Sequence, residues 1–433
     1  MTTPAPPRSA GPSTSTADTD RADGTPGADP TTSAEGTTGG PLQGLRVVEV
    51  GQLLAGPFCG QLLGDLGADV VKIEDPSRGD PLRMWGRQRP KDQSLWWSIV
   101  GRNKRSVTLN LREPEGQDLA RALIAEADIL VENFRPGTME RWGLGYEALR
   151  ELNPGLVMVR VSGFGQDGPY AARPGYGAIG EAMGGLRYVV GDPSTPPSRM
   201  GISIGDTLAA MFATIGALAA LRERDVSGRG QIVDSAIYEA VLGVMESLIP
   251  EWQLTGYQRE RTGAVLPNIA PSNIYPTRDG TWMLIAANQD TVFGRLAAAI
   301  GQPELATDER YATHVARGDR QVELDNLIAE FTVTQGVEEL EALLIEHAVP
   351  HGKIFRPVEM LADPHFQARE TITTVPHPVL GDVQMQNVFP RLSRTTGTVR
   401  WPGPELGAHT AEVLAEVGVD ETRLAQLRER GLA

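Results

Sequence analysis

Short apolar runs alternate with stretches of helical spacing along the first half of the chain. The runs at 45–50, 69–74, 128–133 and 156–162 are rich in Val, Ile and Leu, as buried strands are. Helical spacing is found between them, at 57–66, 114–127 and 146–152. Repeated strand–helix units predict a parallel sheet with helices on both faces, which is an α/β fold.

A longer apolar stretch follows, from Thr207 to Leu221. It is rich in Ala and free of Pro, so it predicts a buried helix, and Asp206 is expected to cap its N-terminus. A carboxylate at a helix N-terminus is stabilised by the helix dipole and could also serve as a nucleophile. We expect no run to approach the roughly 20 apolar residues of a membrane helix, and hence no membrane partner.

The second half of the chain has a different pattern. A strand at 228–234 and a helix to about 254 are followed by a Pro-containing linker, 255–271. The turn signal Arg278-Asp279-Gly280 predicts a hairpin, which opens a smaller α+β domain at 272–347. A linker, a β-rich stretch at 375–389 and a helix at 420–430 are expected within 348–433. Residues 1–40 are mainly Pro, Ser, Thr, Gly, Ala and Asp, and we expect a disordered tail.

Composition excludes several classes of function. A net charge of −15 over 433 residues disfavours a nucleic-acid partner, because such proteins usually present a basic surface. The single cysteine, Cys59, cannot form a disulfide within the chain, and a cytoplasmic location is expected. His347 and His351 have the spacing of HExxH, but Ala348 replaces its glutamate, so no metal site is expected.

Two short motifs point to other enzyme classes without the context that those classes require. Gly51, Gly56 and Gly60 follow the first strand but do not match GxGxxG, which argues against dinucleotide binding. The stretch 201–205 matches the GxSxG hydrolase elbow around Ser203, but a Pro- and Ser-rich loop precedes it where a strand is needed.

Basic residues gather in the first half, several of them just after predicted strands. Ligands of open α/β sheets bind at such strand ends, and Arg forks suit phosphate oxygens. The group comprises Lys72, Arg83, Arg102, Lys104, Arg105, Arg112, Arg135, Arg141 and Arg173.

With these features, the chain resembles the class III CoA-transferases, which include formyl-CoA transferase, carnitine CoA-transferase and α-methylacyl-CoA racemase. The matching stretches run in order along the chain: 41–47, 55–57, 64–74 (GDLGADVVKIE), 103–106, 131–137 (VENFRPG), 153–154, 162–170, 204–206, 228–231 and 407–410. The resemblance implies a Rossmann-like large domain built from both chain ends, 41–254 and 348–433. It also implies an interlocked dimer, which we expect to be a homodimer.

The resemblance also implies the site. The family nucleophile falls on Asp206. Contacts with coenzyme A are implied for Ala55, Leu109, Asn110, Leu111, Arg112, Asn133, Phe134, Arg135, Arg141, Arg173 and Tyr176. The implied substrates are coenzyme A thioesters and a small carboxylic acid, with no permanently bound cofactor.

The implied reaction moves CoA from an acyl-CoA to a carboxylic acid. Asp206 would attack the thioester, forming first a mixed anhydride and then an aspartyl-CoA thioester. Succinyl-CoA or another dicarboxylate is the expected substrate, with Arg187 or Arg199 pairing with its second carboxylate.

Departures from the family pattern leave two alternatives open. Gly177 stands where many transferases have an acidic residue, and Glu181 is a candidate replacement. The missing acid favours the hypothesis of a non-catalytic CoA-binding subunit of a heteromeric transferase. The racemase branch has a histidine at the position of Tyr176, so a 2-methylacyl-CoA isomerase is the weaker alternative.

Overall fold

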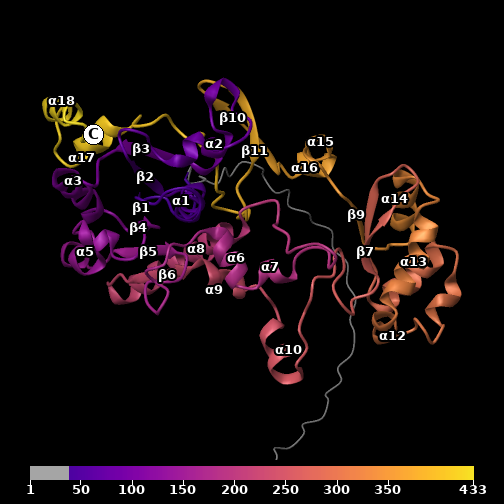
Figure 1. The fold of residues 1–433 in the computed structure, drawn as a ribbon. Coiled ribbons are helices and arrows are strands. Elements are labelled where there is room, and N and C mark those ends of the chain that lie inside the picture. The colour runs from indigo at the N-terminus through magenta and orange to yellow at the C-terminus, as the bar shows by residue number, and fades with distance from the viewer. Residues whose placement is uncertain (1–38) are drawn as a thin grey trace, which may run out of the picture. The chain divides into compact units, whose positions relative to one another are not determined.

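A six-stranded parallel sheet organises the larger part of the molecule (Figure 1). The computed structural model describes residues 39–433, so almost all of the tail predicted at 1–40 lies outside it. The sheet order β3-β2-β1-β4-β5-β6 is that of doubly wound Rossmann folds and confirms the predicted α/β class. Its strands are β1 Arg46–Glu49, β2 Asp69–Glu74, β3 Lys104–Thr108, β4 Ile129–Glu132, β5 Val157–Ser162 and β6 Ile232–Ala236.

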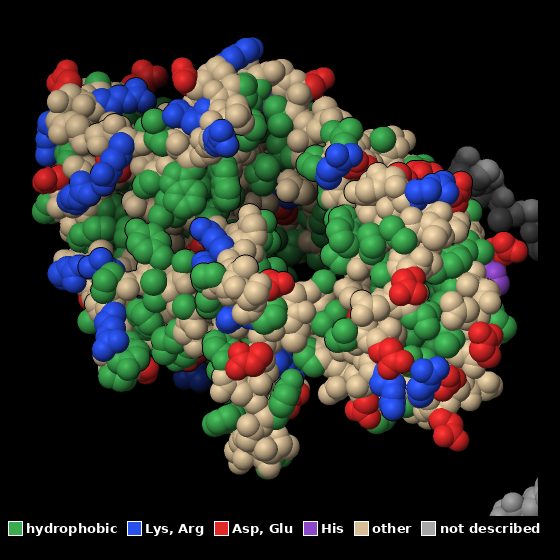
Figure 2. All heavy atoms as spheres, turned by 45° about the vertical axis from the view of Figure 1, so that its right-hand side comes forward, with side chains coloured by type: hydrophobic (Ala, Val, Ile, Leu, Met, Phe, Trp, Pro, Cys, Tyr) green, Lys and Arg blue, Asp and Glu red, His purple; other side chains and the backbone are tan. Residues whose placement is uncertain are grey.

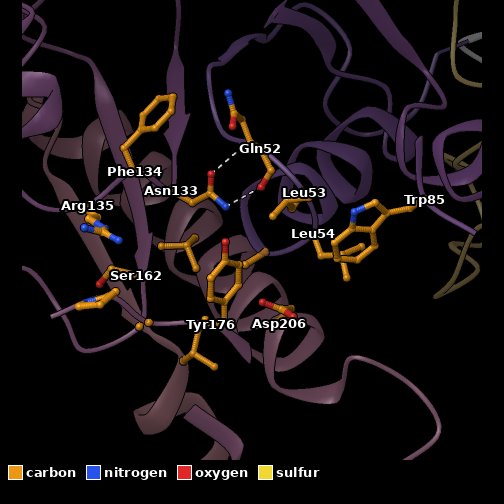
Figure 3. A pocket seen from close by; sticks show the side chains of 16 residues that line it. Gln52, Leu53, Leu54, Trp85, Asn133, Phe134, Arg135, Ser162, Tyr176 and Asp206 are labelled. Atoms are coloured by element: carbon orange, nitrogen blue, oxygen red, sulfur yellow. Dashed lines mark hydrogen bonds between the residues drawn. The ribbon is translucent and has the colours of Figure 1, made fainter. Parts of the chain in front are cut away.

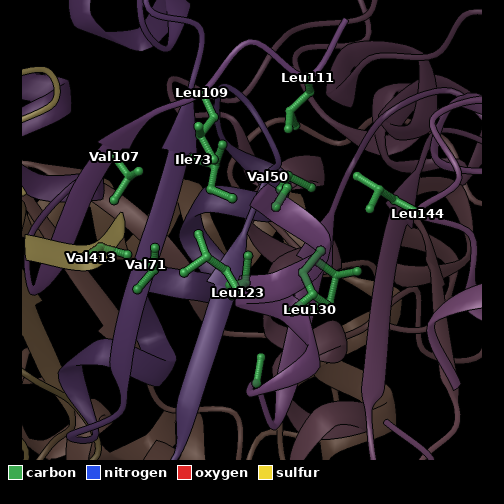
Figure 4. Packing of buried hydrophobic residues seen from close by; sticks show 14 of the residues in the cluster. Val50, Val71, Ile73, Val107, Leu109, Leu111, Leu123, Leu130, Leu144 and Val413 are labelled. Carbon is green, nitrogen blue, oxygen red and sulfur yellow. The ribbon is translucent and has the colours of Figure 1, made fainter. Parts of the chain in front are cut away.

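Helices cover both faces of this sheet because neighbouring strand residues point to opposite sides. Val48 and its counterparts face helices α3 (Pro114–Ala125), α17 (Thr410–Glu416) and α18 (Glu421–Glu429), as Figure 4 shows for part of this core. Val47 and its counterparts face α1 (Ala55–Asp65), α8 (Ile204–Ser227) and α9 (Ile237–Leu242). The C-terminal helices therefore complete a core that the N-terminal half begins.

Two smaller sheets lie in the second half of the chain. The predicted hairpin is confirmed as β7 (Ser272–Pro276) and β8 (Trp282–Ala286), and β9 (His351–Lys353) adds a third antiparallel strand beyond the boundary expected at 347. Helices α11 Asp290–Ala299, α12 His314–Asp319, α13 Gln321–Thr332 and α14 Val337–Glu346 lie between β8 and β9 in sequence, and this segment has its own core. The β-rich stretch expected at 375–389 forms β10 (Ile372–His377) and β11 (Gly381–Gln386).

The remaining elements are short. They are η1 Pro81–Met84, η2 Pro90–Asp92, α2 Leu95–Val100, α4 Thr138–Arg141, α5 Tyr146–Leu152, α6 Gly177–Met183, α7 Leu186–Val189, α10 Leu248–Thr255, η3 Pro303–Ala306, α15 Pro357–Ala362 and α16 Pro364–Ala368.

Helix α8 differs from its prediction in three respects. It begins at Ile204 with Ser203 at the N-cap, so Asp206 lies in its first turn and the predicted cap is wrong. By length and composition α8 is apolar enough to cross a membrane, which corrects the expectation that no run approaches that length. Only one face is buried, against α1, β5 and β6, whereas Met211, Phe212 and Ile215 are exposed.

Candidate active site

The sheet order places a crevice between β1 and β4. The chain leaves β1 towards β2 and leaves β4 towards β5, so the connections diverge at this point, where open α/β sheets bind ligands. A cavity of about 340 Å³ occupies the carboxyl ends of these strands. Figure 3 shows its main lining residues: Gln52, Leu53 and Leu54 after β1; Asn133, Phe134 and Arg135 after β4; Ser162 at the end of β5; and Trp85, Tyr176 and Asp206. Ala55 also lines it.

Side chains fix three consecutive residues of the turn between β1 and α1. Lys72 donates to the carbonyl oxygen of Gly51. The Asn133 side chain accepts from the Gln52 N–H at 2.7 Å and donates to its carbonyl at 2.8 Å, as the dashed lines in Figure 3 show. The next N–H, of Leu53, points at both carboxylate oxygens of Asp80, at 3.1 and 3.2 Å. Leu53 has φ 65°, a conformation unusual for leucine, so the turn depends on these contacts.

A fully buried ionic cluster supports this turn from below. Lys72 lies 2.9 Å from both Glu49 and Asp80, and Lys104 lies 2.8 Å from Glu49, all four side chains being inaccessible to solvent. Burial lowers the pKa of Lys72, but Asp80 and Glu49 outweigh it and hold the ammonium charged. Lys72 and Lys104 are therefore structural ion-pair partners.

Four of the other basic residues predicted near strand ends lie in two different environments. Arg83, Arg102 and Arg105 form ion pairs with Glu74, Asp65 and Asp69. Each of these three guanidiniums is largely buried against its carboxylate, which leaves little of it open to a phosphate. Arg135 has no such partner among the described residues, and it lines the cavity that contains Asp206.

Asp206 has an unusual environment. A Cβ at Gly177 would lie 2.2 Å from its Oδ2 atom, so its carboxylate fits against the start of α6 only because residue 177 is glycine. Within residues 39–433, no donor hydrogen-bonds to this carboxylate. Burial, and then the Glu181 carboxylate, raise the pKa of Asp206 to about 6, while Arg199 acts in the opposite direction. With this pKa the carboxyl is mainly ionised at neutral pH, and none of the described residues occupies its lone pairs.

Two glycines bring the wall of the cavity together beside Asp206. A Cβ on Gly163, just after β5, would lie 2.7 Å from the Cα of Gly175, and the reverse contact has the same length. Only glycine at both positions allows the two backbones to approach so closely. The approach brings Ser162 next to the segment that carries Tyr176, and both line the cavity.

A second cavity, of about 220 Å³, lies beside the first and shares Gln52 and Phe134 with it. Four consecutive residues from the predicted coenzyme A set line it: Leu109, Asn110, Leu111 and Arg112. Phe134 packs edge-on against Trp142, with ring centroids 5.0 Å apart. Arg112 is exposed, 3.5 Å from Asp75, and Arg78 lines the same cavity. The second cavity therefore combines an aromatic wall with cationic side chains.

The last two predicted coenzyme A residues lie just outside these cavities. Arg141 is exposed and donates to the hydroxyl of Thr138, which lines the second cavity. Arg173 stacks on the Tyr170 ring, 3.7 Å from its centroid, and precedes Pro174, which lines the first. The structure thus brings together Ala55, Asn133, Phe134, Arg135, Tyr176 and Asp206 at one cavity, with Arg141 and Arg173 at the margins.

Other residues considered from the sequence do not take part. Ser203 follows a loop rather than a strand, which removes the basis of the hydrolase elbow. Arg187 is paired with Glu181 at 2.8 Å. In the part of the chain that the structure describes, no group of His, Cys, Asp and Glu side chains could hold a metal ion.

Sequence reasoning missed several lining residues. Gln52, Leu53 and Leu54 lie in the glycine-bearing turn after the first strand, a place that could have indicated them. Trp85 and Arg78 lie between β2 and β3 in a segment without a recognisable pattern, so no signal was available for them.

The protein is therefore a Rossmann-like α/β protein. It has a carboxylate without a hydrogen-bond donor among the described residues, in a cavity at the switch point of its sheet. The profile of the family described as CoA-transferase family III matches residues 42–410, so the chain belongs to that family and is a CoA-transferase acting on CoA thioesters.

Individual relatives agree with this assignment. The chain is 58% identical over 391 residues to a succinyl-CoA--D-citramalate CoA-transferase of Chloroflexus aurantiacus, covering 90% of this chain and 97% of the relative. It is 42% identical over 393 residues to the alpha subunit of a succinyl-CoA--L-malate CoA-transferase of the same organism, covering 90% and 92%. The crystal structure of a CaiB/BaiF family protein from Brucella suis superposes with a TM-score of 0.78 at 36% identity, covering 88% of this chain and all of that one.

Proposed function

We propose that the chain transfers CoA from succinyl-CoA to a second dicarboxylic acid through covalent intermediates on Asp206. The observation that carries this proposal is the Asp206 carboxylate itself. It lies in the cavity at the switch point, accepts no hydrogen bond from the described residues, and has its place secured by Gly177. A carboxylate in this state can attack an acyl group without first losing a partner.

The two adjoining cavities suit the two ends of a CoA thioester. The second cavity has an aromatic wall at Phe134 and Trp142 and the exposed guanidinium of Arg112, which suit adenine and phosphate. The first cavity shares Gln52 and Phe134 with it and contains Asp206, so the pantetheine arm would run from one to the other.

Four balanced steps follow from this placement. Asp206 attacks the thioester carbonyl, the C–S bond breaks, and an acyl-aspartyl anhydride and CoA thiolate form. The thiolate attacks the aspartyl carbonyl and releases the donor acid, leaving an aspartyl-CoA thioester. The acceptor carboxylate attacks that thioester and expels the thiolate, which then attacks the new acyl carbonyl and frees Asp206. Every nucleophile and leaving group is an anion, so no step needs a proton.

A dicarboxylate is proposed for two reasons. Both relatives described above are named for transfer between succinyl-CoA and a dicarboxylic hydroxy acid. In addition, Arg199 acts electrostatically on Asp206 and has, among residues 39–433, only a 3.4 Å hydrogen bond to Ser203. Since Arg187 is already paired with Glu181, we assign recognition of the second carboxylate to Arg199.

Trapping experiments test the role of Asp206. The purified enzyme, incubated with succinyl-CoA and hydroxylamine, should give an aspartyl hydroxamate at residue 206, identified by peptide mass spectrometry. Asp206→Asn should yield none and should lose exchange between succinyl-CoA and labelled succinate. Hydroxamate at another residue, or full exchange by Asp206→Asn, would refute the proposal.

The same purified chain separates the alternatives. One relative is the alpha subunit of a transferase, so the hypothesis that this chain requires a second, different subunit is also tested. CoA exchange by the purified chain alone would exclude that hypothesis. Deuterium entering C2 of a 2-methylacyl-CoA would instead indicate the isomerase. That reaction needs an acid–base pair, and no histidine lines either cavity within the described residues.

We also propose a homodimer. Large apolar side chains are exposed on α6, α8 and α10, among them Ile179, Phe212, Ile215 and Trp252. Apolar side chains also lie among charged ones on the face drawn in Figure 2. Exposed apolar surface of this extent usually marks a protein interface. Light scattering during size-exclusion chromatography should give twice the chain mass, and a monomer would contradict the proposal.

A further inference from the structure

A second carboxylate lies directly behind the nucleophile, and no step of the proposed reaction uses it. Glu181 is fully buried on α6, four residues after Gly177, so both lie on the same face of that helix. This face meets the first turn of α8. The N–H of Gly205 points at Oε1 of Glu181 at 3.4 Å, and the next residue, Asp206, lies against Gly177.

The two helices pack closely at this contact. A Cβ on Gly205 would lie 2.9 Å from the carbonyl oxygen of Gly177 and 3.0 Å from Cγ of Glu181. Glu181 therefore fills the space behind Gly205 and fixes the start of α8 relative to α6. The Glu181 side chain is thus in direct contact with the turn that carries Asp206.

Arg187 completes this arrangement from α7. Its Nε donates to Oε2 of Glu181 at 2.8 Å, and its side chain is mostly buried. A buried carboxylate needs such a partner, because desolvating an unpaired charge is costly. Asp206 thus faces an acid whose charge is largely balanced by an arginine.

We propose that the Glu181–Arg187 ion pair is a positioning device for the nucleophile, with Glu181 holding the first turn of α8 and Arg187 limiting the negative charge that Asp206 experiences. The inference rests on the proposed role of Asp206. Glu181 lines neither cavity, so it does not replace the acid missing at Gly177 as a group that touches substrate.

Other ionisable groups on elements packed against α8 are occupied elsewhere. Cys59 on α1 meets Thr214, Arg160 on β5 pairs with Glu132, Asp234 on β6 accepts from the Gln166 N–H, and Glu239 on α9 accepts from the Tyr238 hydroxyl. Arg199, from the loop before α8, and Tyr176, from the cavity wall, are the remaining groups near Asp206. Removal of the Glu181 charge should accordingly change the pKa of Asp206.

The two members of the pair predict opposite effects on the pH dependence of exchange. In a plot of kcat/KM against pH, activity should fall at low pH as Asp206 becomes protonated, and we call this fall the acid limb. Glu181→Gln removes the anion but keeps an acceptor for the Gly205 N–H. The pKa of Asp206 should therefore fall, and the acid limb should move down by about one pH unit. Arg187→Met leaves Glu181 unbalanced, so the limb should move up by a similar amount. The double variant should behave like Glu181→Gln. KM for succinyl-CoA should change less than twofold in each, because neither residue lines a cavity.

Shifts of opposite sign support the inference. Limbs that stay at the wild-type pH, or that move in the same direction in both single variants, overturn it. Should Arg187→Met fail to fold, Glu181→Gln and the double variant should both show the lowered limb; should Glu181→Gln fail, Arg187→Met and the double variant should move in opposite directions. A limb at the wild-type pH in any single variant that folds overturns the inference. Asp206→Asn separates the two proposals: if it retains exchange, the nucleophile assignment fails, whereas its inactivity together with unshifted limbs refutes only the role of the ion pair.

Discussion

The carboxylate of Asp206 lies where the side chain of residue 177 would begin: a Cβ on Gly177 would stand 2.2 Å from Oδ2, 2.7 Å from Cγ and 3.0 Å from Oδ1. The family resemblance implies an acid at this position, and by that pattern alone the glycine suggests a weakened active site. The geometry indicates instead that Gly177 is required for the position of the nucleophile. The absence of a side chain makes room for the reacting group, and an acid at 177 would compete for its place.

Adding a side chain at 177 should therefore inactivate the enzyme without unfolding it. Gly177→Ala should reduce kcat by about 100-fold, the loss associated with displacing a reacting group by about 1 Å. Gly177→Asp should be at least as impaired. Steady-state exchange assays and thermal melts are the measurements. Gly201→Ala is the matched control, since a Cβ there meets nothing within 4 Å. Wild-type kcat in Gly177→Asp would show that position 177 tolerates a second acid.

The raised pKa of Asp206 predicts the pH dependence of the wild-type enzyme. The nucleophile must be ionised and its pKa is about 6, so kcat/KM should fall tenfold per pH unit below that value and level off above it. Exchange rates measured from pH 4.5 to 8.5 would show this limb. A flat profile down to pH 5 would mean that Asp206 titrates normally.

The same pKa has a consequence for stability. The folded-state pKa of about 6 exceeds the reference value of 3.8, so the native state binds the proton more tightly between those values. Ionised Asp206 therefore costs stability above about pH 6, on the order of 2–3 kcal/mol, and the cost disappears as the pH falls below about 4. Asp206→Asn should be more stable than wild type in urea at pH 7.5 and should lose that advantage near pH 4. Equal stability at pH 7.5 would contradict the destabilised nucleophile.

The framework of the sheet could be predicted from local pattern alone. The runs of Val, Ile and Leu gave β2 at Asp69–Glu74, and helical spacing gave α5 at Tyr146–Leu152, both with the observed ends. A buried strand needs only its own residues to be apolar, and this information is local. The start of α8 was not predictable in this way, because capping preferences allow Ser203 and Asp206 equally.

For the site, local sequence could predict which residues lie near strand ends but not which partners they have. Lys72 and Arg112 both follow the same rule, a cation at or beyond a strand of the sheet, yet one is sealed among carboxylates and the other is exposed. Asn133 locks a turn that is 81 residues earlier in the chain. The partners and burial of each side chain depend on which distant residues the fold brings together, and no local sequence pattern contains this information.

Recognition of the second carboxylate is tested at Arg199. Losing a charge-assisted hydrogen bond costs about 1.5–3 kcal/mol, so Arg199→Gln should raise KM for succinate as acceptor by about tenfold to 100-fold. KM for butyrate, which lacks the second carboxylate, should not change. Arg222→Gln, at the far end of α8, serves as the control for loss of one positive charge. An equal effect on succinate and butyrate would assign Arg199 a general electrostatic role instead.

Because Lys72 is buried among carboxylates and Arg112 is exposed, replacing Lys72 should affect the stability of the fold, whereas replacing Arg112 should affect binding of succinyl-CoA. Lys72→Met removes the cation that pairs with buried Asp80, leaves Glu49 with Lys104 alone and releases the Gly51 carbonyl, so it should destabilise the fold by about 3–5 kcal/mol. Arg112→Met removes an exposed cation and should change stability by less than about 0.5 kcal/mol. It should instead raise KM for succinyl-CoA while leaving kcat near its wild-type value. Urea unfolding and exchange kinetics on both variants decide: a stable Lys72→Met protein would show that the turn between β1 and α1 holds without its buried ion pairs.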